Sequence, residues 1–117
     1  MKCLIVDDDP LSRGTIEHYC SLSEHLELTH SCESAIEGLN FLSKTKIDVI
    51  FLDVEMPEMT GLQMLESMQA DGAPYVVLVT SKKEYAVDAF EYNVIDYLLK
   101  PVDYVRFLKA INKLLSQ

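Results

Sequence analysis

A short, unbroken apolar run constrains the fold of this chain more than any other feature. The run from Val49 to Leu52 contains only β-branched, aromatic and aliphatic side chains. A strand that is apolar at every position is buried on both faces, which is typical of a parallel sheet covered by helices on each side. The run ends at the carboxylate of Asp53 and leads into a loop that contains Pro57 and Gly61. The sequence therefore predicts an acidic side chain at the carboxyl edge of the sheet, where open α/β sheets place their ligand chemistry.

Strand and helix patterns alternate along the whole chain. Apolar runs predict five strands, over Lys2 to Val6, Leu26 to Ser31, Val49 to Leu52, Tyr75 to Val79 and Ile95 to Leu99. Helical spacing predicts five helices, over Pro10 to Leu22, Ser34 to Lys44, the segment after Gly61, Lys82 to Tyr92, and Asp103 to Leu115. Short connections with right-handed crossovers then predict one α/β domain over residues 1–117, a doubly wound five-stranded parallel sheet with helices on both faces.

The spacing of apolar residues also predicts which helix faces are buried. The first helix has Asp9 as its cap and Pro10 at its first position. Its inward residues are expected to be Leu11, Thr15, Tyr19 and Leu22, and those of the last helix Tyr104, Leu108, Ile111 and Leu115.

Composition excludes several classes of function. The formal net charge of -9 argues against nucleic-acid binding by this domain, because such binding needs a basic patch. No stretch approaches the roughly 20 apolar residues that cross a bilayer, and no signal-peptide pattern is present, so the expected location is the cytoplasm, away from the membrane. Cys3, Cys20 and Cys32 have no metal-site spacing and are expected to be small buried residues.

Polar residues stand at the carboxyl ends of four predicted strands. They are Asp7 and Asp8, then Asp53, Thr80 and Lys100. Because parallel strands end at the same edge, we expect three carboxylates to converge if the first and third strands are neighbours. A cation is then needed to hold them, and oxygen-only ligands favour Mg²⁺ or Mn²⁺. A carboxylate can also hold a phosphoryl group as an acyl phosphate, with positive charge supplied by the cation and a lysine.

Four segments resemble a known family: Val6-Asp7-Asp8-Asp9-Pro10, Leu52-Asp53-Val54-Glu55-Met56-Pro57-Glu58-Met59-Thr60-Gly61, Val79-Thr80-Ser81 and Tyr97-Leu98-Leu99-Lys100-Pro101. In order and over the whole chain, they resemble the receiver domain of bacterial two-component response regulators. The resemblance implies a flavodoxin-like sheet of order 2-1-3-4-5. It also implies a phosphorylation-activated switch, which catalyses only its own phosphorylation and dephosphorylation and is not otherwise an enzyme.

The resemblance assigns roles to the acids. Asp53 would be the phosphoacceptor, charged by a phosphohistidine of a sensor histidine kinase. Asp8 and Asp53 would bind Mg²⁺ directly, Asp7 mainly through water, and Glu55 through its backbone carbonyl.

The resemblance also assigns the switch. Thr80 and Lys100 would contact the phosphoryl oxygens, Tyr97 would turn inward on phosphorylation, and the bond before Pro101 would be cis. The fourth helix, fifth strand and fifth helix would form a homodimer face.

A contact between the side chains of Glu55 and Lys82 is also expected, and this expectation does not come from the shared motifs. Each stands two positions after a site residue, so the two can meet across the mouth of the site as a partly exposed ion pair. The alternative is two solvated side chains that do not meet.

The segment from Tyr85 to Pro101 is similar to receivers of LytTR-type transcription regulators, which carry a DNA-binding domain after the receiver. That domain is absent from this chain. We therefore expect either a receiver fragment of a transcription regulator or a stand-alone receiver that acts in a phosphorelay or by protein binding.

Two other functions are compatible with parts of the sequence. A small haloacid-dehalogenase-type phosphatase would use Asp7-x-Asp9, but it expects Thr or Val where Leu11 stands, and it leaves Asp53 and Lys100 without roles. A degenerate receiver that only binds partners is opposed by the complete set of phosphorylation residues.

Overall fold

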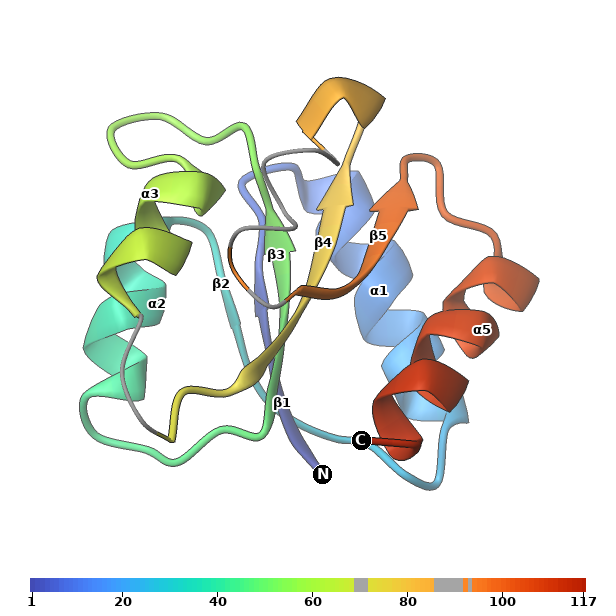
Figure 1. Ribbon diagram of the computed structural model, residues 1–117. Helices are drawn as coiled ribbons and strands as arrows, with labels where there is room; N and C mark the ends of the chain where they lie inside the picture. Colours follow the sequence, from blue (N-terminus) through green and yellow to red (C-terminus); the bar gives the residue numbers. More distant parts are fainter. Residues whose placement is uncertain (69–71, 86–91, 93) are drawn as a thin grey trace.

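A five-stranded parallel sheet forms the centre of the computed structural model, which describes residues 1–68, 72–85, 92 and 94–117 (Figure 1). The strand order is β2-β1-β3-β4-β5. The strands are β1 Lys2–Val6, β2 Glu27–Cys32, β3 Val49–Asp53, β4 Tyr75–Thr80 and β5 Val94–Leu99. The helices of the described part are α1 Pro10–Leu22, α2 Ala35–Leu42, α3 Gly61–Ser67 and α5 Tyr104–Leu115, with a 3-10 turn η1 at Lys83–Tyr85.

The structure confirms the five predicted strands to within one residue at each end and confirms the order 2-1-3-4-5. Four of the five predicted helices are present. The remaining one, predicted over Lys82 to Tyr92, falls mainly on residues outside the described ranges; the structure describes η1 at its beginning. No helix in the described ranges is long and apolar enough to cross a bilayer.

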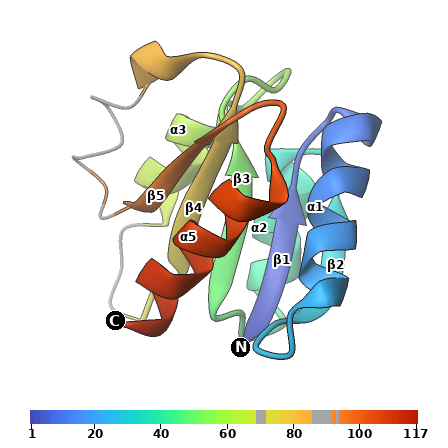
Figure 2. The same ribbon diagram turned by 90° about the vertical axis from the view of Figure 1, so that its right-hand side faces the viewer.

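The helices cover the two faces of the sheet in pairs (Figures 1 and 2). On the face covered by α1 and α5, Phe51 of β3 stacks on Phe107 of α5, with ring centroids 5.5 Å apart. On the face covered by α2 and α3, Leu52 and Met64 belong to a second apolar cluster. Because neighbouring strand residues point to opposite faces, every residue of β3 is buried, as its unbroken apolar run predicts.

The predicted inward face of α1 is confirmed at Tyr19, which packs against the core, and is wrong at Leu11 and Leu22. The buried residues of α1 are Ile16 and Cys20, whereas Leu11 is 80% exposed and Leu22 is 53% exposed. Ile16 and Cys20 lie one turn apart, so they share a stripe that faces the sheet. Leu11 and Leu22 belong to the terminal turns and lie off that stripe.

The predicted inward face of α5 is also confirmed only in part. Its buried residues are Phe107, Ala110, Ile111 and Leu114. Ile111 is buried and Tyr104 packs against the core, both as predicted, but Leu108 is 37% exposed and Leu115 is 43% exposed. Helix α5 has two apolar lines, and the one with the aromatic ring of Phe107 packs on the sheet. The other line, Val105, Leu108 and Leu115, remains on the surface and is called the α5 outer stripe below.

Candidate functional site

The carboxyl edge of the sheet gathers the polar residues that the sequence places at strand ends. Asp7 and Asp8 follow β1, Asp53 ends β3, Thr80 ends β4, and Lys100 follows β5. Three of them are withdrawn from solvent: Asp7 is 2% exposed, Asp53 4% and Thr80 0%. Buried polar groups need partners, so the packing itself marks this edge as a site.

Three carboxylates meet there. One oxygen from each of Asp7, Asp8 and Asp53 lies within 4.8 Å of the other two. The pKa of Asp53 is raised to about 7, mainly by burial and also by the charge of Asp7, while the charge of Lys100 opposes the increase. These carboxylates therefore repel one another, and a divalent cation would relieve the repulsion. An oxygen-only set with two buried members and one exposed member fits Mg²⁺ or Mn²⁺.

Lys100 links the acids to the last strand. Its Nζ lies 3.2 Å from Asp7 Oδ2 and 3.4 Å from Asp53 Oδ1, and its side chain is 17% exposed. The backbone N–H of Lys100 donates to the carbonyl oxygen of Thr80 at 2.8 Å, which ties the ends of β4 and β5 together. The bond from Lys100 to Pro101 is cis, as the resemblance implies.

Thr80 and Tyr97 lie on neighbouring strands. The Thr80 hydroxyl accepts a long hydrogen bond, 3.4 Å, from the backbone N–H of Lys82. Tyr97 is half-buried and packs against the apolar cluster beneath α2 and α3, and its hydroxyl oxygen is shielded from solvent. Burial is the main cause of its raised pKa.

The β3–α3 loop and the segment after β4 meet through polar side chains. Lys82 Nζ lies 2.9 Å from Glu55 Oε1, so the predicted ion pair is present. The Tyr85 hydroxyl donates to the same oxygen at 3.1 Å, a contact that the sequence analysis did not find. The hydrogen bond from Lys82 is the main cause of the lowered pKa of Glu55. The position of Tyr85, three residues after Lys82 and hence one helical turn away, is the signal that could have revealed it.

Gly61 holds the β3–α3 loop close to its strand. A Cβ at Gly61 would collide with the backbone carbonyl oxygen of Asp53, and its N–H donates to the carbonyl of Val54 at 2.8 Å. The loop can return over the end of β3 only where no side chain is present.

The first turn of α1 supports Asp7. Asp7 Oδ1 accepts from the backbone N–H of Asp9 at 2.9 Å, and Arg13 Nη1 donates to the Asp7 carbonyl at 2.8 Å. Arg13 was not expected at the site, although it stands one turn after the cap Asp9.

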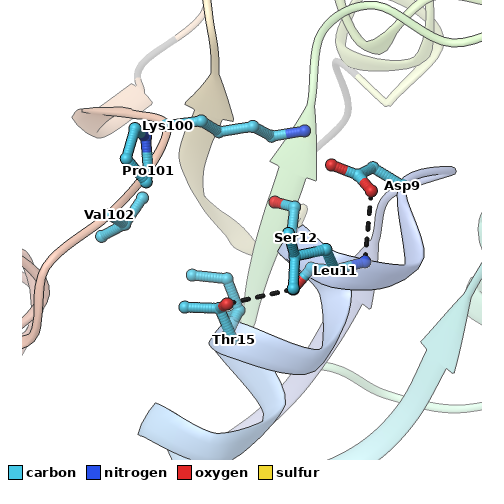
Figure 3. Close-up of a pocket in the computed structure, with 8 residues that line it drawn as sticks. Asp9, Leu11, Ser12, Thr15, Lys100, Pro101 and Val102 are labelled. Carbon is cyan, nitrogen blue, oxygen red and sulfur yellow. Dashed lines mark hydrogen bonds between the residues drawn. The ribbon is translucent and has the colours of Figure 1, made fainter.

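A pocket of about 200 Å³ opens beside the acids. It lies between the first turns of α1 and the segment from Lys100 to Val102, with Leu11 and Asp9 on its rim (Figure 3).

Sequence comparison finds a match to the response regulator receiver domain over residues 3–112. The transcriptional regulatory protein BtsR of Escherichia coli K12 is 40% identical over 114 residues, 97% of this chain and 48% of that protein. An uncharacterized response regulatory protein of Vibrio cholerae is 38% identical over 117 residues, 100% of this chain and 49% of that protein. The chain thus spans about half the length of the curated relatives that it matches.

Solved structures show the same fold. The response regulatory domain of MrkE from Klebsiella pneumoniae superimposes with a TM-score of 0.93 at 32% identity, covering 99% of this chain and 96% of that one. The REC domain of AraT, a response regulator from Geobacillus stearothermophilus, gives a TM-score of 0.89 at 30% identity, covering 98% and 92%.

Proposed function

Because this chain belongs to the response regulator receiver domain family, a family of two-component signalling rather than metabolic enzymes, we propose that Asp53 is its phosphoacceptor. The observation that carries the proposal is the placement of Asp53 at the end of β3, buried between Asp7, Asp8 and the ammonium group of Lys100. A carboxylate oxygen of Asp53 attacks the phosphorus of a phosphohistidine on a sensor histidine kinase. The O–P bond forms, the N–P bond breaks, and the histidine leaves with its electron pair.

Mg²⁺ is the proposed cofactor. Asp8 and Asp53 would hold it directly, Asp7 through water, and Glu55 through its backbone carbonyl. When bound, the cation supplies positive charge that neutralises the transferring phosphoryl group. Lys100 lies within 3.4 Å of both buried acids and supplies a second positive charge from the opposite side of β3.

Thr80 and Tyr97 form the proposed switch. The hydroxyl of Thr80 is fully buried, and its hydrogen bond with Lys82 is long, so it can be exchanged for one to a phosphoryl oxygen. The Tyr97 hydroxyl is already shielded in this structure. Phosphorylation would then stabilise the inward orientation of Tyr97 and shift a population that exists beforehand.

The output is proposed from the relatives. BtsR is named a transcriptional regulatory protein, and this chain covers 48% of it. We place this receiver in the cytoplasm and in front of a DNA-binding domain, of LytTR type by resemblance, with a stand-alone role as the alternative. Dimerisation on phosphorylation would use β5 and α5, where the α5 outer stripe is exposed, together with the predicted fourth helix, most of which lies outside the described residues.

Acetyl phosphate with Mg²⁺ tests the acceptor. Mass spectrometry of the wild-type protein should show one added phosphoryl group per chain, and Asp53→Asn should show none. Asp48→Asn changes a carboxylate at the opposite end of β3 and serves as the matched control that still accepts the group. Undiminished aspartyl phosphate in Asp53→Asn would refute the assignment. Catalytic release of phosphate from unrelated substrates would instead favour the phosphatase, and Mg²⁺ binding with no phosphoryl uptake in the wild type would favour the degenerate receiver.

A further inference from the structure

A second cluster of metal-binding side chains lies outside the phosphoacceptor site. One ligand atom from each of His30, Cys32 and Glu37 lies within 4.8 Å of the other two. His30 and Cys32 are two residues apart on β2 and therefore point to the same face of the strand. Glu37 comes from the first turn of α2, which packs beside β2 (Figure 1).

The donor set and spacing match a zinc site. Zn²⁺ binds thiolate, imidazole and carboxylate groups, and with bond lengths of about 2.0–2.3 Å it holds tetrahedral ligand atoms roughly 3.5 Å apart. His30 Nε2 and Glu37 Oε1 are already 3.2 Å apart. Moving the three ligand atoms inward by about 1 Å or less would complete one face of a tetrahedron.

Neighbouring groups hold the two outer ligands in place. The His30 ring stacks on Phe41 of α2, with ring centroids 4.7 Å apart and 13° between the planes. The second carboxylate oxygen of Glu37 accepts from the backbone N–H of Glu33 at 3.1 Å. A hydrogen bond that orients a carboxylate before any ion arrives is typical of metal sites, and the stacked ring of Phe41 restricts rotation of the imidazole.

The three side chains of the cluster lie at different depths below the surface. Cys32 is 0% exposed, whereas the side chains of His30 and Glu37 are 42% and 45% exposed. An ion would therefore enter between the two outer ligands and reach the sulfur at the bottom. Burial and the charge of Glu37 raise the pKa of the Cys32 thiol to about 12, so without an ion the sulfur stays protonated and unreactive.

We propose that His30, Cys32 and Glu37 form a binding site for Zn²⁺, with the fourth coordination position open to water. The site is distinct from the all-oxygen acid cluster by its soft sulfur donor, which Mg²⁺ does not select. It is also adjacent to that cluster, because the backbone carbonyl of Cys32 accepts from the N–H of Asp7 at 3.0 Å. The alternative, a surface ion pair lying over a core cysteine, has no affinity for a soft cation.

Zinc titration of the metal-free protein tests the site, with excess Mg²⁺ present to compete with Zn²⁺ for the acid cluster. We expect one Zn²⁺ per chain in the wild type, measured by competition with a zinc indicator. His30→Gln and Glu37→Gln change exposed side chains and should leave the circular dichroism spectrum unchanged. Each should weaken binding by at least about 100-fold, because loss of a direct ligand exceeds the effect of losing an outer partner. His25→Gln changes an exposed histidine outside the cluster and should bind as the wild type does.

Binding of Co²⁺ shows directly whether the sulfur of Cys32 is a metal ligand. Co²⁺ in the wild type should give a thiolate-to-metal charge-transfer band, which Cys32→Ser should lose and Cys20→Ala should keep. The proposal would be overturned if the wild type bound no Zn²⁺ in excess Mg²⁺, or if its Co²⁺ complex lacked the thiolate band. It would also be overturned if His30→Gln and Glu37→Gln bound Zn²⁺ as tightly as the wild type does.

Discussion

Lys82 Nζ and Glu55 Oε1 meet 2.9 Å apart, which joins the β3–α3 loop to the segment after β4 at the mouth of the acid cluster. Their side chains are 51% and 42% exposed, so solvent screens the pair and it contributes little to stability. We propose that its position, rather than its energy, bears on function, because Glu55 stands two residues after Asp53 and Lys82 stands two residues after Thr80.

If the pair acts as a gate, Lys82→Ala should shorten the lifetime of the phosphoryl group on Asp53, and Glu55→Ala should do the same. The double variant should be no faster than the faster single variant, because either change alone opens the gate. Charge alone predicts opposite effects, since Lys82 attracts a dianion and Glu55 repels it. Loss of radiolabel from purified phosphoprotein measures the lifetime. Additive effects of the two substitutions would show that the residues do not act as a pair.

Leu11 is 80% exposed on the rim of the pocket beside Lys100. Burial of this apolar side chain by a binding partner would be favourable. We expect Leu11→Ala to slow phosphoryl transfer from a purified histidine kinase but not from acetyl phosphate, which needs no docking. Leu28→Ala removes an exposed leucine from β2 and is the control. An equal loss with both donors would mean that Leu11 supports the site itself and not the kinase contact.

The two glycines Gly61 and Gly14 should respond to alanine in opposite ways. Gly61→Ala forces a methyl group against the Asp53 carbonyl and should destabilise the protein by about 1–3 kcal/mol, with weaker phosphorylation. Gly14 lies inside α1 with nothing within 4 Å of an added Cβ, so Gly14→Ala should stabilise the protein by up to about 1 kcal/mol. Urea denaturation measures both, and a tolerated Gly61→Ala would show that the loop can move off its strand.

The contacts of Asp96 predict how the stability of the folded protein changes in acid. Burial disfavours its charge, but hydrogen bonds from Arg106 (2.7 and 2.8 Å) and the Tyr97 N–H outweigh burial and lower the pKa below its usual value of 3.8. A carboxyl group with a lowered folded-state pKa contributes stability above about pH 4 and loses it as the pH falls.

Arg106→Gln should therefore destabilise the protein by about 1–3 kcal/mol at neutral pH and move acid unfolding to higher pH. Circular dichroism across an acid titration measures the midpoint. Lys109→Gln removes one positive charge from the exposed side of the same helix and should leave the midpoint nearly unchanged. Identical shifts in both variants would attribute the effect to net charge.

The α5 outer stripe should control association. Val105 is 65% exposed, and Val105→Asp places a charge among apolar neighbours. With beryllium fluoride and Mg²⁺, sedimentation should show dimers of the wild type and monomers of Val105→Asp. Leu22→Asp changes an exposed leucine of α1 and should still dimerise. No association of the wild type at high concentration would exclude dimerisation by this domain.

Much of the site follows from local sequence. The apolar run of β3 and the acids after β1 and β3 are contiguous features, and parallel strands necessarily bring their carboxyl ends to one edge. The residues Asp9, Ser34 and Asp103 cap their helices through bonds that span two or three residues. The Glu55–Lys82 pair was predictable for the same reason, since each side chain lies two positions from a strand end that the topology already places.

The tertiary structure alone decided which helix faces are buried and which distant side chains meet. Apolar residues lie on more than one side of α1 and of α5, and only packing against the sheet selects Ile16 over Leu11 and Phe107 over Leu108. The ion pair of Asp96 with Arg106 depends on how α5 lies across β5. His30 and Cys32 face Glu37 because of the approach of α2 to β2. Spacing along the chain carries no signal for such contacts, because they depend on the angle and register between elements rather than on either element alone.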